Sequence, residues 1–392
     1  LKYIVFKIFK PNYSRKTLKN IIKYSSILFI LALSSSYIAS CFAIDLKILN
    51  YQERQIGFSL SFFGLGVILA VLFHNYIREK INIYISLIIA TFAQSILSCY
   101  LLFDVQLFIV ATIMLLFGFT NGINVMTIET HISSNFKKNA GFYIALFWSS
   151  AGLGAITGTL IIAINGINEL TYKIGLFLIV FQLIPIMFFR FSLKIIAIDR
   201  VSFHLSFEVI TKLKYLLFCV FLLGICDAGF SALYPSYLLE NSFIDKEIGR
   251  INFFAGSLAL LVYPFMGKII DRYNKIIIFN FLCLLNLVGL FFINFTYNFY
   301  LLILYTGIYY FTVGSVFLIC FNIIGHKLEK NLVVFGVGGY TFSENIGSIF
   351  GPNAIGNIIN INVDYFFRIF FIIFLLIILL FNLSQIKKNV EP

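Results

Sequence analysis

The sequence predicts an all-α polytopic membrane protein with twelve transmembrane helices in two pseudo-symmetric six-helix bundles. Three observations lead to this prediction. Of the 392 residues, 60% are hydrophobic and 12% are charged, whereas a soluble domain carries about 25% charged residues. Apolar runs long enough to cross a bilayer recur along the whole chain. Features of the first half return in the second half at an offset of 192 residues.

Each predicted helix is an apolar run of about 20 residues or more between polar clusters. Because lipid offers no hydrogen-bond partner to an open sheet edge, such runs are expected to be helical. The runs of the first half are 21–44, 55–76, 81–103, 105–128, 140–165 and 172–196. Those of the second half are 213–238, 249–271, 275–295, 299–325, 331–357 and 363–386. The third and fourth runs are separated by little more than Asp104.

The basic residues orient these helices. The net charge is +12, and 23 of the 29 Lys and Arg residues fall in segments on the same side of the membrane as the N-terminus. Basic loops mark the cytoplasmic side, so both termini are expected to be cytoplasmic. The short loops favour a bacterial inner (plasma) membrane. The same distribution accounts for the positive charge without a nucleic-acid partner.

An alternative for the N-terminus is a cleaved signal, since Ile38-Ala39-Ser40-Cys41 resembles a lipoprotein cleavage box. Cleavage would leave eleven helices and break the alternation of charge, so an uncleaved first helix is favoured.

The repeat divides the chain into two halves of like orientation. Gly57 pairs with Gly249, Gly64 with Gly256, and Glu79-Lys80 with Asp271-Arg272. We therefore predict five segments: a basic cytoplasmic segment 1–20, a six-helix bundle 21–196, a cytoplasmic linker 197–212, a second bundle 213–386 and a cytoplasmic tail 387–392.

One loop adds a family resemblance. The stretch Gly267-Lys268-Ile269-Ile270-Asp271-Arg272-Tyr273-Asn274-Lys275 resembles the Gly-x-x-x-Asp-Arg-x-x-Arg/Lys signature of the major facilitator superfamily (MFS). Its counterpart in the first half is degraded, with Asn75 in place of the Gly and Glu79 in place of the Asp. The resemblance implies a transporter that works by alternating access. It also implies an inward gate at Asn75, Glu79, Lys80, Gly267, Asp271 and Arg272, although a solvated, charge-balanced turn is the alternative.

Two elements of that family are missing. Met114 stands where many proton-coupled members carry an Arg ahead of the Gly that is here Gly118, and 152–158 lacks the proline of many drug/proton antiporters. The second departure weakens an efflux assignment.

Two carboxylates lie deep in the apolar runs, Asp227 in the seventh and Glu344 in the eleventh. A charge at the centre of a membrane helix costs about 2.5 to 3.5 kcal/mol on insertion scales, so such residues usually face the interior and serve a function. We interpret both as proton or cation coupling sites. The alternative is that each is neutral and hydrogen-bonded to a neighbouring helix.

No Lys or Arg lies at comparable depth, so the substrate is expected to be neutral or cationic. Polar groups that could line its cavity are Asn121, Asn124, Tyr309 and Asn322. Buried amides also pair across helices, which is the alternative for these positions.

The predicted function is secondary transport of a small solute by a monomer in lipid, driven by protons or another ion. The four histidines fall near different loops, the six cysteines form no Cys-x-x-Cys pair, and no ATP-binding loop is present. We therefore expect no enzyme activity, no metal and no cofactor. Multidrug or metabolite efflux and a non-transporting membrane receptor or scaffold are the alternatives.

Overall fold

A computed structural model describes the backbone of residues 15–80, 85, 88–90, 92–93, 106–135, 140–166, 203–328 and 333–386. Within these ranges the chain is helical apart from short turns, which confirms the all-α prediction. The first half supplies α2 (Arg15–Ile48), α3 (Glu53–Lys80), α5 (Leu107–Asn135) and α6 (Ala140–Asn165). The second half supplies α9 (Phe203–Glu240), α10 (Asp245–Arg272), α11 (Lys275–Ile293), α12 (Phe299–Lys327), α13 (Val333–Ile359) and α14 (Tyr365–Ile386).

Nine of the helices in the described ranges are long and apolar enough to cross a membrane. Helix α13 is not among these nine, and its sequence between Gly338 and Asn345 is rich in glycine and polar residues. The expected run 172–196 lies outside the described residues, and 81–103 is described only in fragments. Helix α9 begins at Phe203, within the range expected for the linker.

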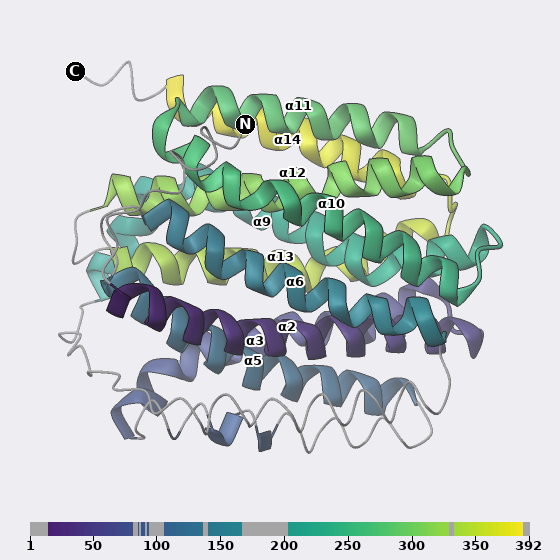
Figure 1. Cartoon of the computed structure of the whole chain (residues 1–392), viewed down its shortest axis with the longest axis horizontal. Helices are drawn as coiled ribbons and strands as arrows, with labels where there is room; N and C mark the ends of the chain where they lie inside the picture. Colours follow the sequence, from purple (N-terminus) through teal and green to yellow (C-terminus); the bar gives the residue numbers. More distant parts are fainter. Residues whose placement is uncertain are drawn as a thin grey trace.

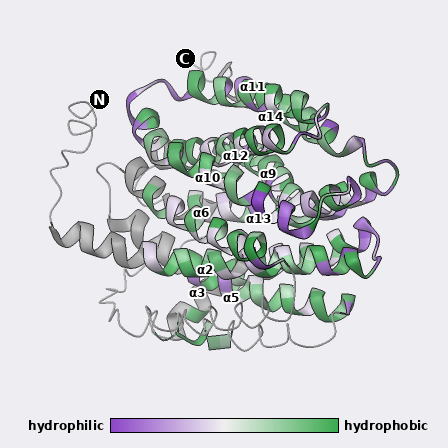
Figure 2. Ribbon diagram, turned by 45° about the vertical axis from the view of Figure 1, so that its right-hand side comes forward, coloured by the Kyte–Doolittle hydropathy of each residue, from purple (hydrophilic) through white to green (hydrophobic). Residues whose placement is uncertain are grey.

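The helices lie side by side along the longest axis of the molecule (Figure 1), with hydrophobic residues along their lengths and hydrophilic ones gathered at the turns (Figure 2). Two ends of the bundle can therefore be named. The Lys47 end holds Ile48, Glu53, Asn165, Glu240 and Asp245, and the Asp271 end holds the turn between α10 and α11.

The packing of the helices repeats between the halves. Helix α2 packs on α6 as α9 packs on α13, and α3 packs on α5 as α10 packs on α12. Between the halves, α3 packs on α13 and α6 packs on α10. Exchanging the halves turns one of these contacts into the other, which is the pseudo-two-fold relation that the sequence repeat predicts.

Large apolar side chains cover the outside of α11, where Phe281, Leu284 and Phe291 are each more than half exposed. In water such a surface would drive aggregation. On a membrane-spanning helix it is the surface that contacts lipid.

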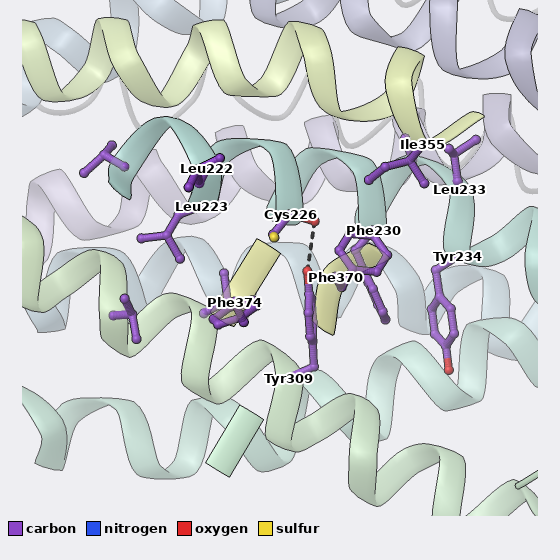
Figure 3. Close-up of a cluster of buried hydrophobic side chains, with 14 of the residues drawn as sticks. Leu222, Leu223, Cys226, Phe230, Leu233, Tyr234, Tyr309, Ile355, Phe370 and Phe374 are labelled. Carbon is purple, nitrogen blue, oxygen red and sulfur yellow. Dashed lines mark hydrogen bonds between the residues drawn. The ribbon is translucent and has the colours of Figure 1, made fainter. Parts of the chain in front are cut away.

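Aromatic side chains fill the interior of the second half (Figure 3). Phe230 of α9 stacks between Tyr234 and Tyr309, with ring centroids 4.4 and 4.1 Å away. The Tyr309 hydroxyl donates to the carbonyl oxygen of Cys226 at 2.9 Å, and that of Tyr234 pairs with Thr306 Oγ1 at 2.7 Å. Buried phenols thus obtain hydrogen-bond partners on neighbouring helices, as an apolar interior requires.

Helices α9 and α13 touch backbone to backbone, and glycines make this possible. A Cβ added at Gly224 would lie 2.2 Å from the carbonyl oxygen of Glu344, and one added at Gly347 would lie 2.1 Å from that of Phe221. Atoms cannot approach this closely, so any side chain at these positions would force the two helices apart.

We expect Gly347→Ala to lower the stability of the folded protein by at least about 2 kcal/mol, because the added methyl group meets backbone rather than a movable side chain. Gly338→Ala on the same helix is the matched control, since a Cβ there meets nothing within 4 Å. Alanine favours a helix over glycine by about 0.8 to 1 kcal/mol, so the control variant should unfold at the parent temperature or above. Thermal unfolding in detergent measures both, and equal melting temperatures for the two variants would contradict the packing described here.

Candidate functional site

The two deep acids lie on the helices that pack most closely in the second half. Asp227 belongs to α9 and Glu344 to α13, and both side chains are partly exposed. The backbone of Glu344 contacts Gly224, which precedes Asp227 by about one helical turn. The glycine contact therefore brings the two acids into one region of the bundle.

Two tyrosines from other helices join this region. The Tyr263 phenol of α10 interacts electrostatically with both Glu344 and Asp227, and the Tyr310 phenol of α12 interacts with Asp227. The Tyr263 hydroxyl donates to the carbonyl oxygen of Gly314 at 2.9 Å, and that of Tyr310 donates to Asn252 Oδ1 at 3.0 Å. We call Asp227, Glu344, Tyr263 and Tyr310 the acid–tyrosine cluster.

The hydrogen bonds decide what this cluster can bind. Each phenol has one proton, and in both tyrosines that proton is already donated to another acceptor. The phenol oxygens can then offer only lone pairs, and the ionised carboxylates likewise only accept. Four oxygen-bearing groups that accept and do not donate make this region of the bundle favourable for a proton or a cation.

The cluster lies beside the boundary between the halves. Asn345, next to Glu344, places its carbonyl oxygen against Gly64 of α3, where an added Cβ would be 3.1 Å away. Gly256 of α10 faces the Ile156 side chain of α6 in the first half, whose Cγ1 would be 2.7 Å from an added Cβ. Movement of one half against the other would therefore change the surroundings of Glu344 and of α10.

The loop signature is held to α12 at the Asp271 end. Asn322 Nδ2 donates to Asp271 Oδ1 at 3.3 Å. Arg272 is exposed, Gly267 is buried, and the Asn274 side chain caps α11 by accepting from the backbone N–H of Ile276 at 2.9 Å. The structure thus places Asn322, expected along the cavity, beside the loop and not beside the acid–tyrosine cluster.

The other predicted positions are spread over the bundle. Tyr309 is buried in the aromatic interior of the second half, and its phenol also interacts with Asp227. Asn121 and Asn124 lie on α5, partly exposed and fully buried respectively. Asn75, Glu79 and Lys80 occupy the last turns of α3, and their side chains lie outside the described residues.

Sequence reasoning missed several residues. Tyr263 and Asn252 are two among many aromatic and amide positions, and no local pattern marks them. Lys47 contacts Glu53 and Glu240 at the other end of the bundle. The sequence repeat could have predicted the second of these contacts. The offset of 192 pairs position 48 with Glu240, so the ends of the first and seventh helices are related by the pseudo-two-fold axis and meet near it.

Within the described residues no three His, Cys, Asp or Glu side chains are grouped to hold a metal ion. The cysteines in these ranges, namely Cys41, Cys219, Cys226, Cys283 and Cys320, are buried and make no disulfide.

Comparison with known proteins agrees with this geometry. Residues 216–390 match the family model described as Major Facilitator Superfamily. The crystal structure of a single-residue mutant of the nucleoside transporter NupG has a TM-score of 0.75 at 13% identity, covering 93% of this chain and 99% of that chain. The crystal structure of nucleoside transporter NupG itself has a TM-score of 0.71 at 12% identity, covering 93% and 98%. No curated protein matches the sequence.

Together the helices and the family match indicate a multi-pass integral membrane protein, and the family match supports a membrane transporter. The resemblance to the major facilitator superfamily is therefore confirmed, in sequence over residues 216–390 and in fold over nearly the whole chain.

Proposed function

We propose that this protein is a secondary transporter that moves a small neutral or cationic solute by alternating access, with Asp227 and Glu344 as its proton or cation coupling site. The observation that carries the proposal is the acid–tyrosine cluster. Two carboxyl groups and two phenols, carried by four helices of the second half, lie beside the boundary between the halves. Both phenols donate their protons to acceptors outside the cluster.

The solute class follows from charge. The cluster offers acceptors and negative charge, which would repel an anion. The structural similarity to a nucleoside transporter makes a nucleoside, which is an uncharged solute, the first candidate to test. Small amines are the second, because tyrosine faces and carboxylates together suit an ammonium group.

The loop signature serves in this proposal as the inward gate, with Asn322 anchoring Asp271 while the gate is closed. The Asp271 end is then cytoplasmic, as the basic residues predict, and both termini lie on that side of a bacterial inner membrane. One chain supplies both halves of the transport path, so a monomer is sufficient.

The transport test begins with binding. A panel of nucleosides, small amines and sugars is screened for solutes that raise the melting temperature of the purified protein, because ligand binding to the folded state stabilises it. Solutes that raise the melting temperature are then tested for accumulation in proteoliposomes that contain the protein. The proposed solute class would be contradicted if no solute of the panel stabilised the protein, or if no stabilising solute were accumulated.

We expect Asp227→Asn to reduce accumulation driven by a pH gradient by about tenfold or more, because the amide cannot carry the coupling proton. Exchange of labelled for unlabelled solute involves no net proton movement, so it should persist. Asp364→Asn is the matched control, since Asp364 is an exposed acid in the turn before α14. Accumulation by Asp227→Asn at the parent rate across pH would remove this assignment, and Glu344→Gln tests its partner in the same way.

We expect Asn322→Ala to lower the initial transport rate about fivefold, because the loop loses its hydrogen bond to α12 and closure of the gate is a step of the cycle. Asn280→Ala is the matched control. Asn280 and Asn382 exchange amide hydrogen bonds of 3.0 and 2.9 Å between α11 and α14, in a pair that does not involve Asp271. The initial transport rate of each variant is measured and divided by the amount of folded protein. Equal losses of rate in Asn322→Ala and Asn280→Ala would argue that Asn322 matters for helix packing alone.

A further inference from the structure

A cluster of three charged side chains lies at the Lys47 end, far along the helices from the acid–tyrosine cluster. Lys47, in the last turn of α2, contacts the carboxylate of Glu53, the first residue of α3. It also donates to Glu240 Oε1, at the end of α9, over 2.6 Å. The three side chains are 20%, 8% and 29% exposed.

This cluster joins the two halves. Lys47 and Glu53 belong to the first half and Glu240 to the second, so the Lys47–Glu240 contact crosses the boundary, whereas the Lys47–Glu53 contact does not. The backbones around it are also in contact. A Cβ added at Gly57 would lie 2.1 Å from the carbonyl oxygen of Pro352, and one added at Gly356 would lie 2.7 Å from that of Glu53. In this structure the halves are therefore closed against each other at the Lys47 end.

The arrangement of one lysine between two glutamates suits a contact that must break and form again. Breaking a partly buried ion pair normally leaves an unpaired charge, which is costly. Here Glu53 stays beside Lys47 when Glu240 moves away, because both lie on adjoining ends of α2 and α3. Lys47 is then still paired in the open state, and Glu240, the most exposed of the three, is the charge returned to water.

We propose that Lys47, Glu53 and Glu240 form the gate at the Lys47 end, in which the Lys47–Glu240 pair closes the gate and Glu53 neutralises Lys47 while the gate is open. The inference rests on the alternating access of the proposed function, but it concerns a different group of residues and a different end of the bundle.

The test measures how often this end opens, and it needs no solute. Ser61 lies on α3 between Gly57 and Gly64, on the face that packs against α13, and is 4% exposed. A Ser61→Cys reporter in lipid nanodiscs should react with a membrane-impermeant maleimide only when the halves separate there. The parent without this cysteine gives the background from the native thiols.

We expect Lys47→Gln and Glu240→Gln each to raise the labelling rate about tenfold, because the closed state loses its ion pair. The charge exchange Lys47→Glu with Glu240→Lys keeps one lysine among two carboxylates and should return the rate to within about twofold of the parent. Glu53→Gln should act in the opposite direction and slow labelling, since an open gate would leave Lys47 unpaired.

The control is Arg250→Gln, which removes an exposed charge from α10 at the same end and should leave the rate unchanged. Parent-like labelling in Lys47→Gln, with an unchanged melting temperature, would overturn the gate. So would a charge exchange that fails to restore slow labelling, or faster labelling in Glu53→Gln. Labelling needs no solute, so it can be interpreted even if the transport assay fails. If transport is confirmed but labelling is unchanged in these variants, the gate is rejected and the proposed function is not.

Discussion

Close contact between helix backbones is the constraint on which the rest of this structure depends. In lipid no hydrophobic effect drives helices together, so they associate through packing and hydrogen bonds. The chain meets this requirement with glycines. Gly154 and Gly158 of α6 lie against the backbone of α2, and Gly347 and Gly351 of α13 lie against that of α9. The same contact therefore holds the corresponding helix pair together in each half, and the second copy also brings Glu344 beside Asp227.

The contacts between the halves give the sequence repeat a physical cause. Gly64 of α3 meets α13, and Gly256, its partner at the offset of 192, meets α6. Gly57 and Gly249 form a second such pair, each against a helix of the opposite half. Each pair is one contact that occurs twice about the pseudo-two-fold axis. At Gly57 and Gly249 an added side chain would meet backbone of the opposite half at 2.1 and 2.5 Å and would force the halves apart, which accounts for the glycine at these two paired positions.

The fold could be predicted from the sequence because its signals are long or repeated: apolar runs, alternating basic loops and paired glycines. Asp227 and Glu344 could be singled out because a carboxylate is rare at that depth. Their neighbours could not, since nothing local distinguishes Tyr263 among 22 tyrosines. The position of Asn322 beside Asp271 was also inaccessible, because depth along a helix does not say which loop a side chain reaches. The Lys47–Glu240 pair could be predicted only if the repeat was taken to relate the ends of the first and seventh helices about the pseudo-two-fold axis, near which these ends meet.

Helices α9 and α13 connect the acid–tyrosine cluster to the Lys47 end. Glu240 follows Asp227 by thirteen residues on α9, a rise of about 20 Å, and Pro235 lies between them inside the helix. On α13, Glu344 is followed by Pro352, whose carbonyl oxygen faces Gly57 of the other half. Each helix thus carries one acid of the cluster and one contact that closes the end. A proline removes a backbone hydrogen bond and lets a helix bend. Bending at Pro235 or Pro352 would change the contact that closes the Lys47 end, while the glycine contact between α9 and α13 keeps the two acids together.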